Sequence, residues 1–273
     1  MKLTAMLALT ALAMGLATPA RAADPWADAV VDFDLGTGGA AGFDDPAATL
    51  GSPTHTTAPA SPYGGPVTPF NAPYGEGEML SIGEGGWLTV RFDEPVTNHA
   101  MNPYGIDLLL FGNSFMLLSG FPADATTTAS GFGGEGGIVE LSADGSVWVE
   151  ATGVEADGLY PTLGYRDITD PFPTTALVPS DFTRPVDPSI AAADFNGLTT
   201  AQIVALYDGS GGGAGVDIGA YGLSEISYVR VSNPVGSGAT PEIDGFADVR
   251  PAPEPAALAL VVLGAAGWIS RRR

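Results

Sequence analysis

The stretch Gly137–Gly153, GIVELSADGSVWVEATG, is the part of the chain that decides the fold. Its two apolar runs, Ile138–Ser142 and Val147–Ala151, flank the sequence Ala143-Asp144-Gly145-Ser146. An Asp-Gly pair between two runs of alternating apolar residues is a strong signal for a two-stranded hairpin. The stretch therefore predicts two antiparallel strands joined by a tight turn.

Similar short runs follow one another along the chain, separated by turns rich in Gly and Pro. Gly105–Phe111 is almost continuously apolar, as expected for a strand that is covered on both faces. Only Thr199–Gly209 has the pattern of a helix, with a threonine as its cap. We expect an all-β fold, an antiparallel β-sandwich with one short helix, in a single domain over residues 23–250. The other expected strands are Val30–Gly39, Gly86–Phe92, Ile226–Asn233 and Glu242–Val249.

The composition limits the possible functions. The 273-residue chain has no cysteine, which excludes thiol chemistry. Residues 23–250 contain five arginines, no lysine and 30 acidic residues, so their net charge is −25. Such a charge disfavours nucleic acid and anionic membrane surfaces as partners. Divalent cations, basic proteins and neutral sugars remain as partners that this charge allows.

The N-terminal segment has the features of a signal peptide. Lys2 is followed by the apolar run Leu3–Leu16, and Ala20-Arg21-Ala22 fits the small-x-small pattern that signal peptidase recognises. We expect residues 1–22 to form a signal helix that is removed by cleavage after Ala22.

The C-terminal segment, residues 251–273, carries three features in order. Pro253-Glu254-Pro255 precedes the apolar run Ala256–Ile269, and Arg271, Arg272 and Arg273 end the chain. The run is short for a permanent membrane span, which usually needs about 20 apolar residues, and it lacks the amphipathic stripe of a terminal core helix. The arginines would stay on the cytoplasmic side of a membrane.

This segment resembles the PEP-CTERM sorting signal of Gram-negative bacteria. The resemblance implies recognition and cleavage by an exosortase-type protease. The hydrophobic helix would be a transient membrane anchor, and the protein would then reach the cell surface or the exterior, often beside exopolysaccharide.

Residues of the central region carry a second resemblance. It rests on Gly42–Thr54, on Asn102–Phe115, and on the hairpin taken together with ISYVRVSN and EIDGFADV. These stretches resemble an uncharacterised group of exported bacterial cell-surface proteins. The hairpin and the late strand are also similar to the galactose-binding-like jelly roll of discoidin and carbohydrate-binding modules. The group often has an acidic residue where this chain has Gly112, between Phe111 and Asn113.

Three carboxylates are candidates for a calcium site. Asp107 lies inside an apolar run, where an ionised carboxylate is costly unless it is paired or bound to a metal. Glu242 and Asp244 alternate along a strand and so share one face. All three could converge on one Ca²⁺, because hard cations take carboxylate oxygens. They could equally be surface carboxylates, or pair with Arg230 or Arg91.

A second candidate site lies in the long loop Ser52–Glu78. Tyr63, Phe70 and Tyr74, which we expect to be exposed, could stack on sugar rings beside a polar group such as Asn71. The alternative is that these aromatic residues cover the edge of the sandwich.

The residues available for catalysis are few. His55 and His99 are the only histidines, and Ser114 is not part of a G-x-S-x-G nucleophile motif. The sequence therefore indicates a non-catalytic, exported surface or matrix protein that binds polysaccharide or a surface partner. The alternatives are a secreted glycoside hydrolase that uses two carboxylates, and a purely structural coat protein.

Overall fold

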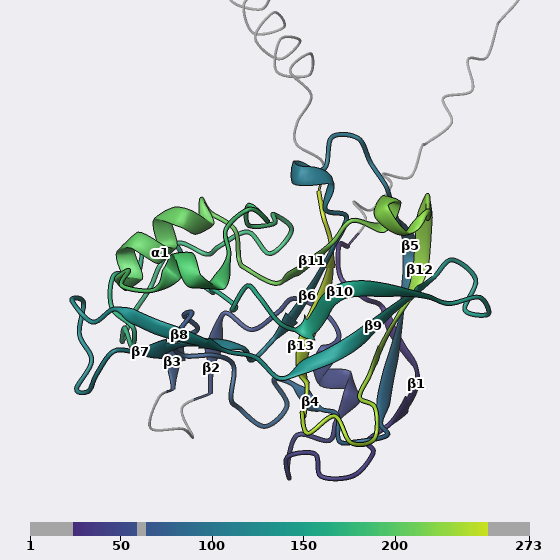
Figure 1. Cartoon of the computed structure of the whole chain (residues 1–273), viewed down its shortest axis with the longest axis horizontal. Coiled ribbons are helices and arrows are strands. Elements are labelled where there is room, and N and C mark those ends of the chain that lie inside the picture. The colour runs from purple at the N-terminus through teal and green to yellow at the C-terminus, as the bar shows by residue number, and fades with distance from the viewer. Residues whose placement is uncertain (1–23, 59–63, 251–273) are drawn as a thin grey trace, which may run out of the picture.

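The computed structural model describes residues 24–58 and 64–250, and this part of the chain is mostly β (Figure 1). Every pairing between its named strands is antiparallel. The expected β-rich, antiparallel fold with one α-helix is thereby confirmed for the described residues. The strands are β1 (Ala29–Asp34), β2 (Thr56–Thr57), β3 (Gly65–Pro66), β4 (Leu80–Ser81), β5 (Trp87–Thr97), β6 (Leu108–Gly112), β7 (Phe115–Leu118), β8 (Ala129–Gly133), β9 (Gly136–Ser142), β10 (Val149–Asp157), β11 (Ala214–Val216), β12 (Glu225–Ser232) and β13 (Glu242–Asp248).

The predicted hairpin is formed by β9 and β10, in which Leu141 lies opposite Val149. Its second strand begins two residues later than expected. The reason is the Asp144 side chain, whose Oδ1 accepts hydrogen bonds from the backbone N–H groups of Ser146 at 2.8 Å and Val147 at 3.0 Å. These contacts hold both residues in the turn and leave the Val147 side chain 69% exposed.

A five-stranded sheet has the order β1-β5-β12-β9-β10, so the hairpin forms one of its edges. The alternation expected in β5 is present, because Leu88, Val90 and Phe92 all enter one hydrophobic cluster. β12 lies between β5 and β9 and pairs with both, which ties the hairpin to the N-terminal half of the chain.

A four-stranded sheet has the order β11-β6-β13-β4, and β6 is buried along its whole length, as predicted. Leu108 and Leu110 face a large cluster that also takes side chains from the five-stranded sheet. Leu109 and Phe111 face a smaller cluster on the other side, with Phe182. The core therefore lies between the two sheets, and β6 has apolar neighbours on both faces.

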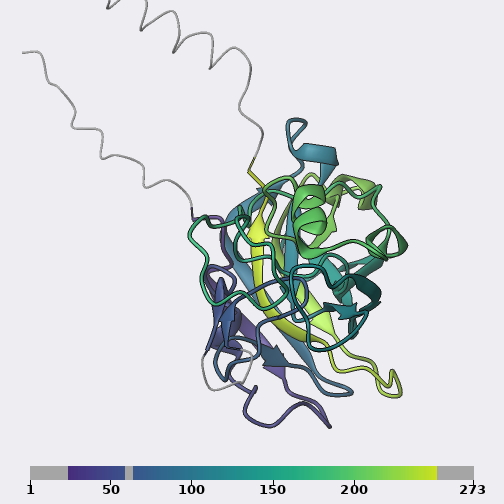
Figure 2. The ribbon, with the colours of Figure 1, turned by 90° about the vertical axis from the view of Figure 1, so that its left-hand side faces the viewer.

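A further hydrophobic cluster is formed by side chains of β7, β8 and the helix α1 (Thr200–Tyr207) together with the loops around them. These three elements lie together to one side of the two larger sheets (Figures 1 and 2). Ile203 and Tyr207 are the helix residues that enter it most deeply. Thr199 caps the helix, as predicted, and its backbone N–H donates to Gln202 Oε1 at 2.9 Å. The four short 3₁₀-helices of the described residues are η1 (Pro46–Thr49), η2 (Pro103–Gly105), η3 (Ala192–Phe195) and η4 (Ile218–Tyr221).

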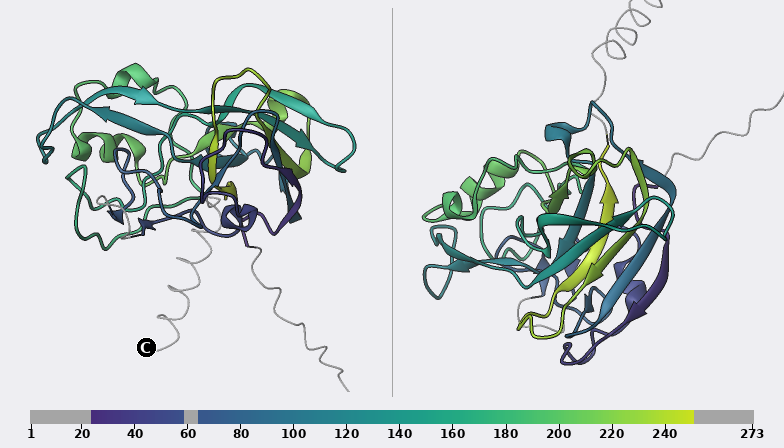
Figure 3. Two further views of the ribbon diagram at one scale, coloured as in Figure 1. Left: turned by 90° about the horizontal axis from the view of Figure 1, so that it is seen from below. Right: turned by 45° about the vertical axis from the view of Figure 1, so that its right-hand side comes forward.

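The two ends of the described region lie side by side (Figures 1 and 3). Trp26 forms a bridge with Ala247, and the N–H of Asp248 donates to the Pro25 carbonyl at 2.7 Å. The expected signal helix and C-terminal hydrophobic helix lie outside the described residues. Within residues 24–58 and 64–250, no helix has the length and apolar character needed to cross a membrane.

Candidate functional site

The three carboxylates proposed for calcium are spread along the β6–β13 pair. Asp248 lies opposite Leu108 and Ile243 lies opposite Gly112. Asp107 is therefore at one end of this ladder and Glu242 at the other, separated by roughly 17–20 Å along the strand direction. The structure does not bring Asp107 together with Glu242 and Asp244. In the described part of the chain, no group of three or more His, Cys, Asp or Glu side chains is arranged to hold a metal ion.

Asp107 is fully buried and is held by protein groups. Its Oδ1 accepts from Asn102 Nδ2 at 2.7 Å and from the His99 N–H at 3.3 Å, and its Oδ2 accepts from the Ile218 N–H at 3.1 Å. Burial raises the pKa of Asp107, and these hydrogen bonds partly offset that rise. The carboxylate thus joins the loop at residues 99–102 to η4.

Asp244 is in a bulge of β13, where the pairing with β6 shifts by one residue. Its two oxygens accept from the backbone N–H and from the hydroxyl of Thr54, each at 2.8 Å. Burial raises the pKa of Asp244 to about 7. This side chain ties β13 to Thr54, which lies two residues before β2.

Glu242 lies near a carboxylate that the sequence did not reveal, Asp157 at the end of β10. Asp157 Oδ1 accepts from the Ser114 N–H at 2.8 Å, and its Oδ2 accepts from the Glu242 N–H at 3.2 Å. Burial raises the pKa of Asp157 to about 7, and the charges of Glu135 and Glu242 add to the effect. Burial also raises the pKa of Glu242, and the charge of Glu135 contributes. The charge of Glu135 therefore raises the pKa of both Asp157 and Glu242, and the charge of Glu242 raises that of Asp157.

A hollow lined mainly by apolar and aromatic side chains adjoins these carboxylates, with a volume of about 600 Å³. We call it the aromatic groove. Asn113 lines it and donates from Nδ2 to Glu242 Oε2, so the acidic residues lie directly behind its wall. The residues of the groove are Phe70, Asn71, Ala72, Tyr74, Asn113, Phe115, Met116, Leu117, Leu118, Phe121 and Phe172.

Two of the three aromatic residues singled out from the sequence line this groove. Tyr74 is 60% exposed, as expected, whereas Phe70 is only 6% exposed. The expectation that Phe70 is exposed was wrong, because its ring packs in the cluster under α1. Tyr63 lies outside the described residues. Sequence reasoning missed Phe115 and Phe121, which are 41% and 71% exposed and come from a different part of the chain.

The aromatic groove combines exposed ring faces with side-chain amides. Phe121 stacks on Phe172 with ring centroids 6.4 Å apart, and Tyr74 contacts Phe43 at 5.7 Å. These neighbours restrict the rings and so lower the entropy that a bound ligand would cost. Ring faces beside a few polar groups are suited to a ligand that has both apolar and hydroxyl surfaces.

The histidine and serine weighed for nucleophilic catalysis are at opposite ends of β6. His99 accepts from the Met101 N–H through Nδ1 at 3.1 Å, beside Asp107. Ser114 is buried at the Gly112 end, and its hydroxyl donates to the Gly158 carbonyl at 2.7 Å. The two side chains therefore do not form a nucleophile–base pair.

Comparison with known proteins assigns no family: no family model matches this chain. No curated protein matches it either. Any functional conclusion must therefore rest on the residues and the geometry described above.

Proposed function

We propose that this protein is an exported, non-catalytic surface or matrix protein that binds neutral polysaccharide in the aromatic groove. The observation that carries the proposal is the groove itself, in which exposed Tyr74, Phe115 and Phe121 surround a hollow of about 600 Å³ that also presents Asn113. The hollow has the size of a site for a small ligand or a short saccharide segment.

A more specific description of the fold is also part of the proposal. We propose that the two sheets form a sandwich of the galactose-binding-like kind. The hydrophobic cluster shared by the sheets, to which Leu110 of β6 and Val229 of β12 both contribute, supports this arrangement. The antiparallel pairing throughout both sheets also supports it.

The export route is the second part of the proposal. It rests on the signal-peptide features of residues 1–22 and on the PEP-CTERM-like residues 251–273. Signal peptidase would cut after Ala22, and an exosortase-type protease near Pro253-Glu254-Pro255. Mass spectrometry of the chain recovered from the cell exterior should then give a first residue of Ala23 and a last residue near Pro253. Recovery of the uncut chain from the cytosol would contradict this route.

Substitution of groove residues tests the binding function. Tyr74→Ala and Phe121→Ala should each weaken binding to a neutral polysaccharide about fivefold, since an aromatic contact contributes about 1 kcal/mol. Binding can be measured by calorimetry with a polysaccharide selected on a glycan array. Tyr104→Ala is the matched control, because Tyr104 is 54% exposed and does not line the groove. Equal affinity of all three variants and the parent would contradict the proposal.

A glycoside hydrolase is the alternative function, and one observation favours it. Glu242, whose pKa burial raises, contacts a groove residue, and a carboxyl group with a raised pKa can act as a general acid. Release of reducing ends from the bound polysaccharide, abolished in Glu242→Gln, would establish this function. Binding without release supports the non-catalytic one.

A further inference from the structure

A second hollow, of about 440 Å³, lies beside the two ends of the described chain. We call it the arginine pocket. It shares no lining residue with the aromatic groove. Its walls include Trp26, His55, Arg166, Ser180, Asp181 and Arg250.

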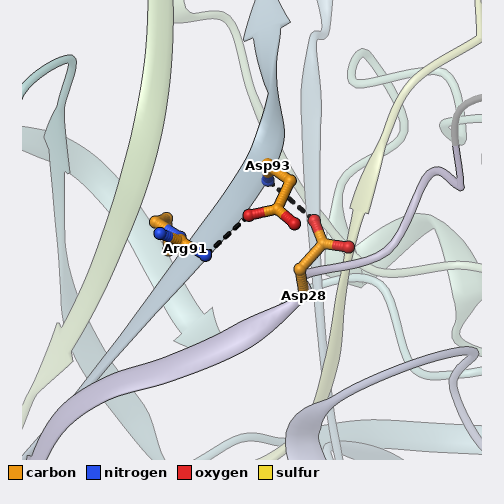
Figure 4. A network of polar contacts seen from close by, with 3 residues as sticks. All are labelled: Asp28, Arg91 and Asp93. Carbon is orange, nitrogen blue, oxygen red and sulfur yellow. Dashed lines mark hydrogen bonds and ion pairs between the residues drawn. The ribbon is translucent and has the colours of Figure 1, made fainter.

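The arginines of this protein divide into two groups. Arg91 pairs with Asp93 at 2.6 Å (Figure 4), Arg184 pairs with Asp208, and Arg230 lies 3.9 Å from Glu140. The two remaining arginines form no ion pair with any residue in 24–58 or 64–250, and both line the arginine pocket. Their charges act on sequence neighbours: Arg166 helps to lower the pKa of Asp167, and Arg250 partly offsets the burial that raises the pKa of Asp248. In a region with six acidic residues for every arginine, two guanidinium groups at one pocket that form no close ion pair with the described residues indicate a site for an anion.

Backbone hydrogen bonds hold the segments that carry these arginines. The Arg166 N–H donates to the Val178 carbonyl at 2.9 Å, and the Arg250 N–H donates to the Thr183 carbonyl at 3.2 Å. Residues 178–183 thus form a common wall between the two arginines. The Asp181 N–H in turn donates to the Gly209 carbonyl at 2.9 Å, which fixes this wall to the end of α1.

Apart from Asp181, whose Oδ1 accepts from the Thr183 hydroxyl at 2.7 Å, uncharged groups complete the pocket. Ser180 is buried, and its hydroxyl has no hydrogen-bond partner within the described residues. The His55 ring packs against Phe182 with centroids 4.4 Å apart, and burial lowers the pKa of His55, which favours the neutral ring. The positive charge of the pocket therefore comes from the two arginines and does not change over the physiological pH range.

We propose that the arginine pocket binds the carboxylate group of an acidic sugar unit, a uronate. A planar guanidinium matches a planar carboxylate through two parallel hydrogen bonds. The volume leaves room for a sugar ring as well as its carboxylate, and the Trp26 and His55 rings offer faces for the ring to pack on. Asp181 and the charge of −25 disfavour more highly charged anions such as phosphate.

Ligand-linked stabilisation of the full chain tests this site. D-Glucuronate should raise the melting temperature in a saturable way, because a ligand that binds only the folded state stabilises it. Arg166→Gln and Arg250→Gln should each weaken binding about tenfold, as expected for the loss of a charge-assisted hydrogen bond. Arg91→Gln removes the same charge outside the pocket and should leave the response unchanged.

Two further comparisons make the result specific. Arg166→Lys and Arg250→Lys keep the charge but lose the planar fork, so their affinity should lie between those of the parent and the Gln variants. Tyr74→Ala should bind glucuronate like the parent, which separates this site from the aromatic groove. Each variant should keep the circular dichroism spectrum of the parent.

Three outcomes would overturn the proposal. They are no response to glucuronate, a response that both Gln variants retain, and an equal or larger response to D-glucose 6-sulfate, inorganic phosphate or D-glucose. Saturation-transfer NMR with glucuronate gives a second measurement that does not depend on unfolding.

Discussion

At the scale of single residues, the Asp157 carboxylate occupies the space that a side chain at position 112 would fill. A Cβ atom at position 112 would overlap the Asp157 carboxylate and would lie 2.6 Å from the Glu242 carbonyl oxygen. In this chain the carboxylate beside position 112 comes from β10, and glycine leaves the room that it needs.

Gly112→Ala should therefore destabilise the protein. We expect the free energy of unfolding to fall by about 1–3 kcal/mol, the usual cost of adding a methyl group to a filled site. Urea unfolding followed by circular dichroism measures the change. The matched control is Gly120→Ala, because a Cβ at position 120 meets nothing within 4 Å. Similar stabilities for the two variants would contradict the packing described for Gly112.

At the scale of elements, local pattern was a good guide. The hairpin, the doubly covered β6 and the helix at Thr199–Gly209 were all predicted, because each depends on neighbours in sequence: a turn motif, an apolar run and a capping residue. The hairpin turn extended further than expected, since the hydrogen bonds of the Asp144 side chain reach two residues beyond the Asp-Gly pair.

Contacts between distant segments could not be predicted in this way. The aromatic groove joins residues 70–74 to β7 and to Phe172, and no periodicity links these segments. Asp157 gave no signal, because its role depends on Ser114 and Glu242, which are 43 and 85 positions away. The separation of Asp107 from Glu242 likewise follows from the register of β13 against β6, which single-strand patterns do not specify.

The close packing of the glycine-rich stretch after α1, Gly209–Gly215, also could not be predicted from the local sequence. Gly211 and Gly213 of this stretch are buried. A Cβ on Gly211 would run into the Phe182 ring, and one on Gly213 would lie 3.0 Å from the Phe111 ring. These glycines allow close packing between the α1 region and the four-stranded sheet.

At the scale of the whole molecule, the stability of the fold depends on pH, because several carboxyl groups are buried. Burial raises the pKa values of Asp157, Asp244 and Asp248 to about 7, against an ordinary value of 3.8. Between these two values the folded protein holds protons that the unfolded chain has already released. The stability that these three groups contribute is therefore fully present below about pH 4 and is lost as the pH rises through about 7.

The free energy of unfolding should accordingly fall between pH 4.5 and pH 7.5 at constant ionic strength, with urea unfolding as the measurement. Asp248→Asn should make this decrease smaller, because Asp248 then no longer titrates. Asp44→Asn removes one exposed charge and should leave the slope nearly unchanged. Stability that rises over this range would show that these carboxyl groups are ionised in the folded protein.

The contact between Trp26 and Ala247 has a consequence for how the molecule is presented to its surroundings. Because the first and last residues of the described region lie side by side, a domain attached through either end is held at the same point of its surface. Removal of the chain beyond one end would therefore leave the attachment point at the same place on the surface relative to the aromatic groove.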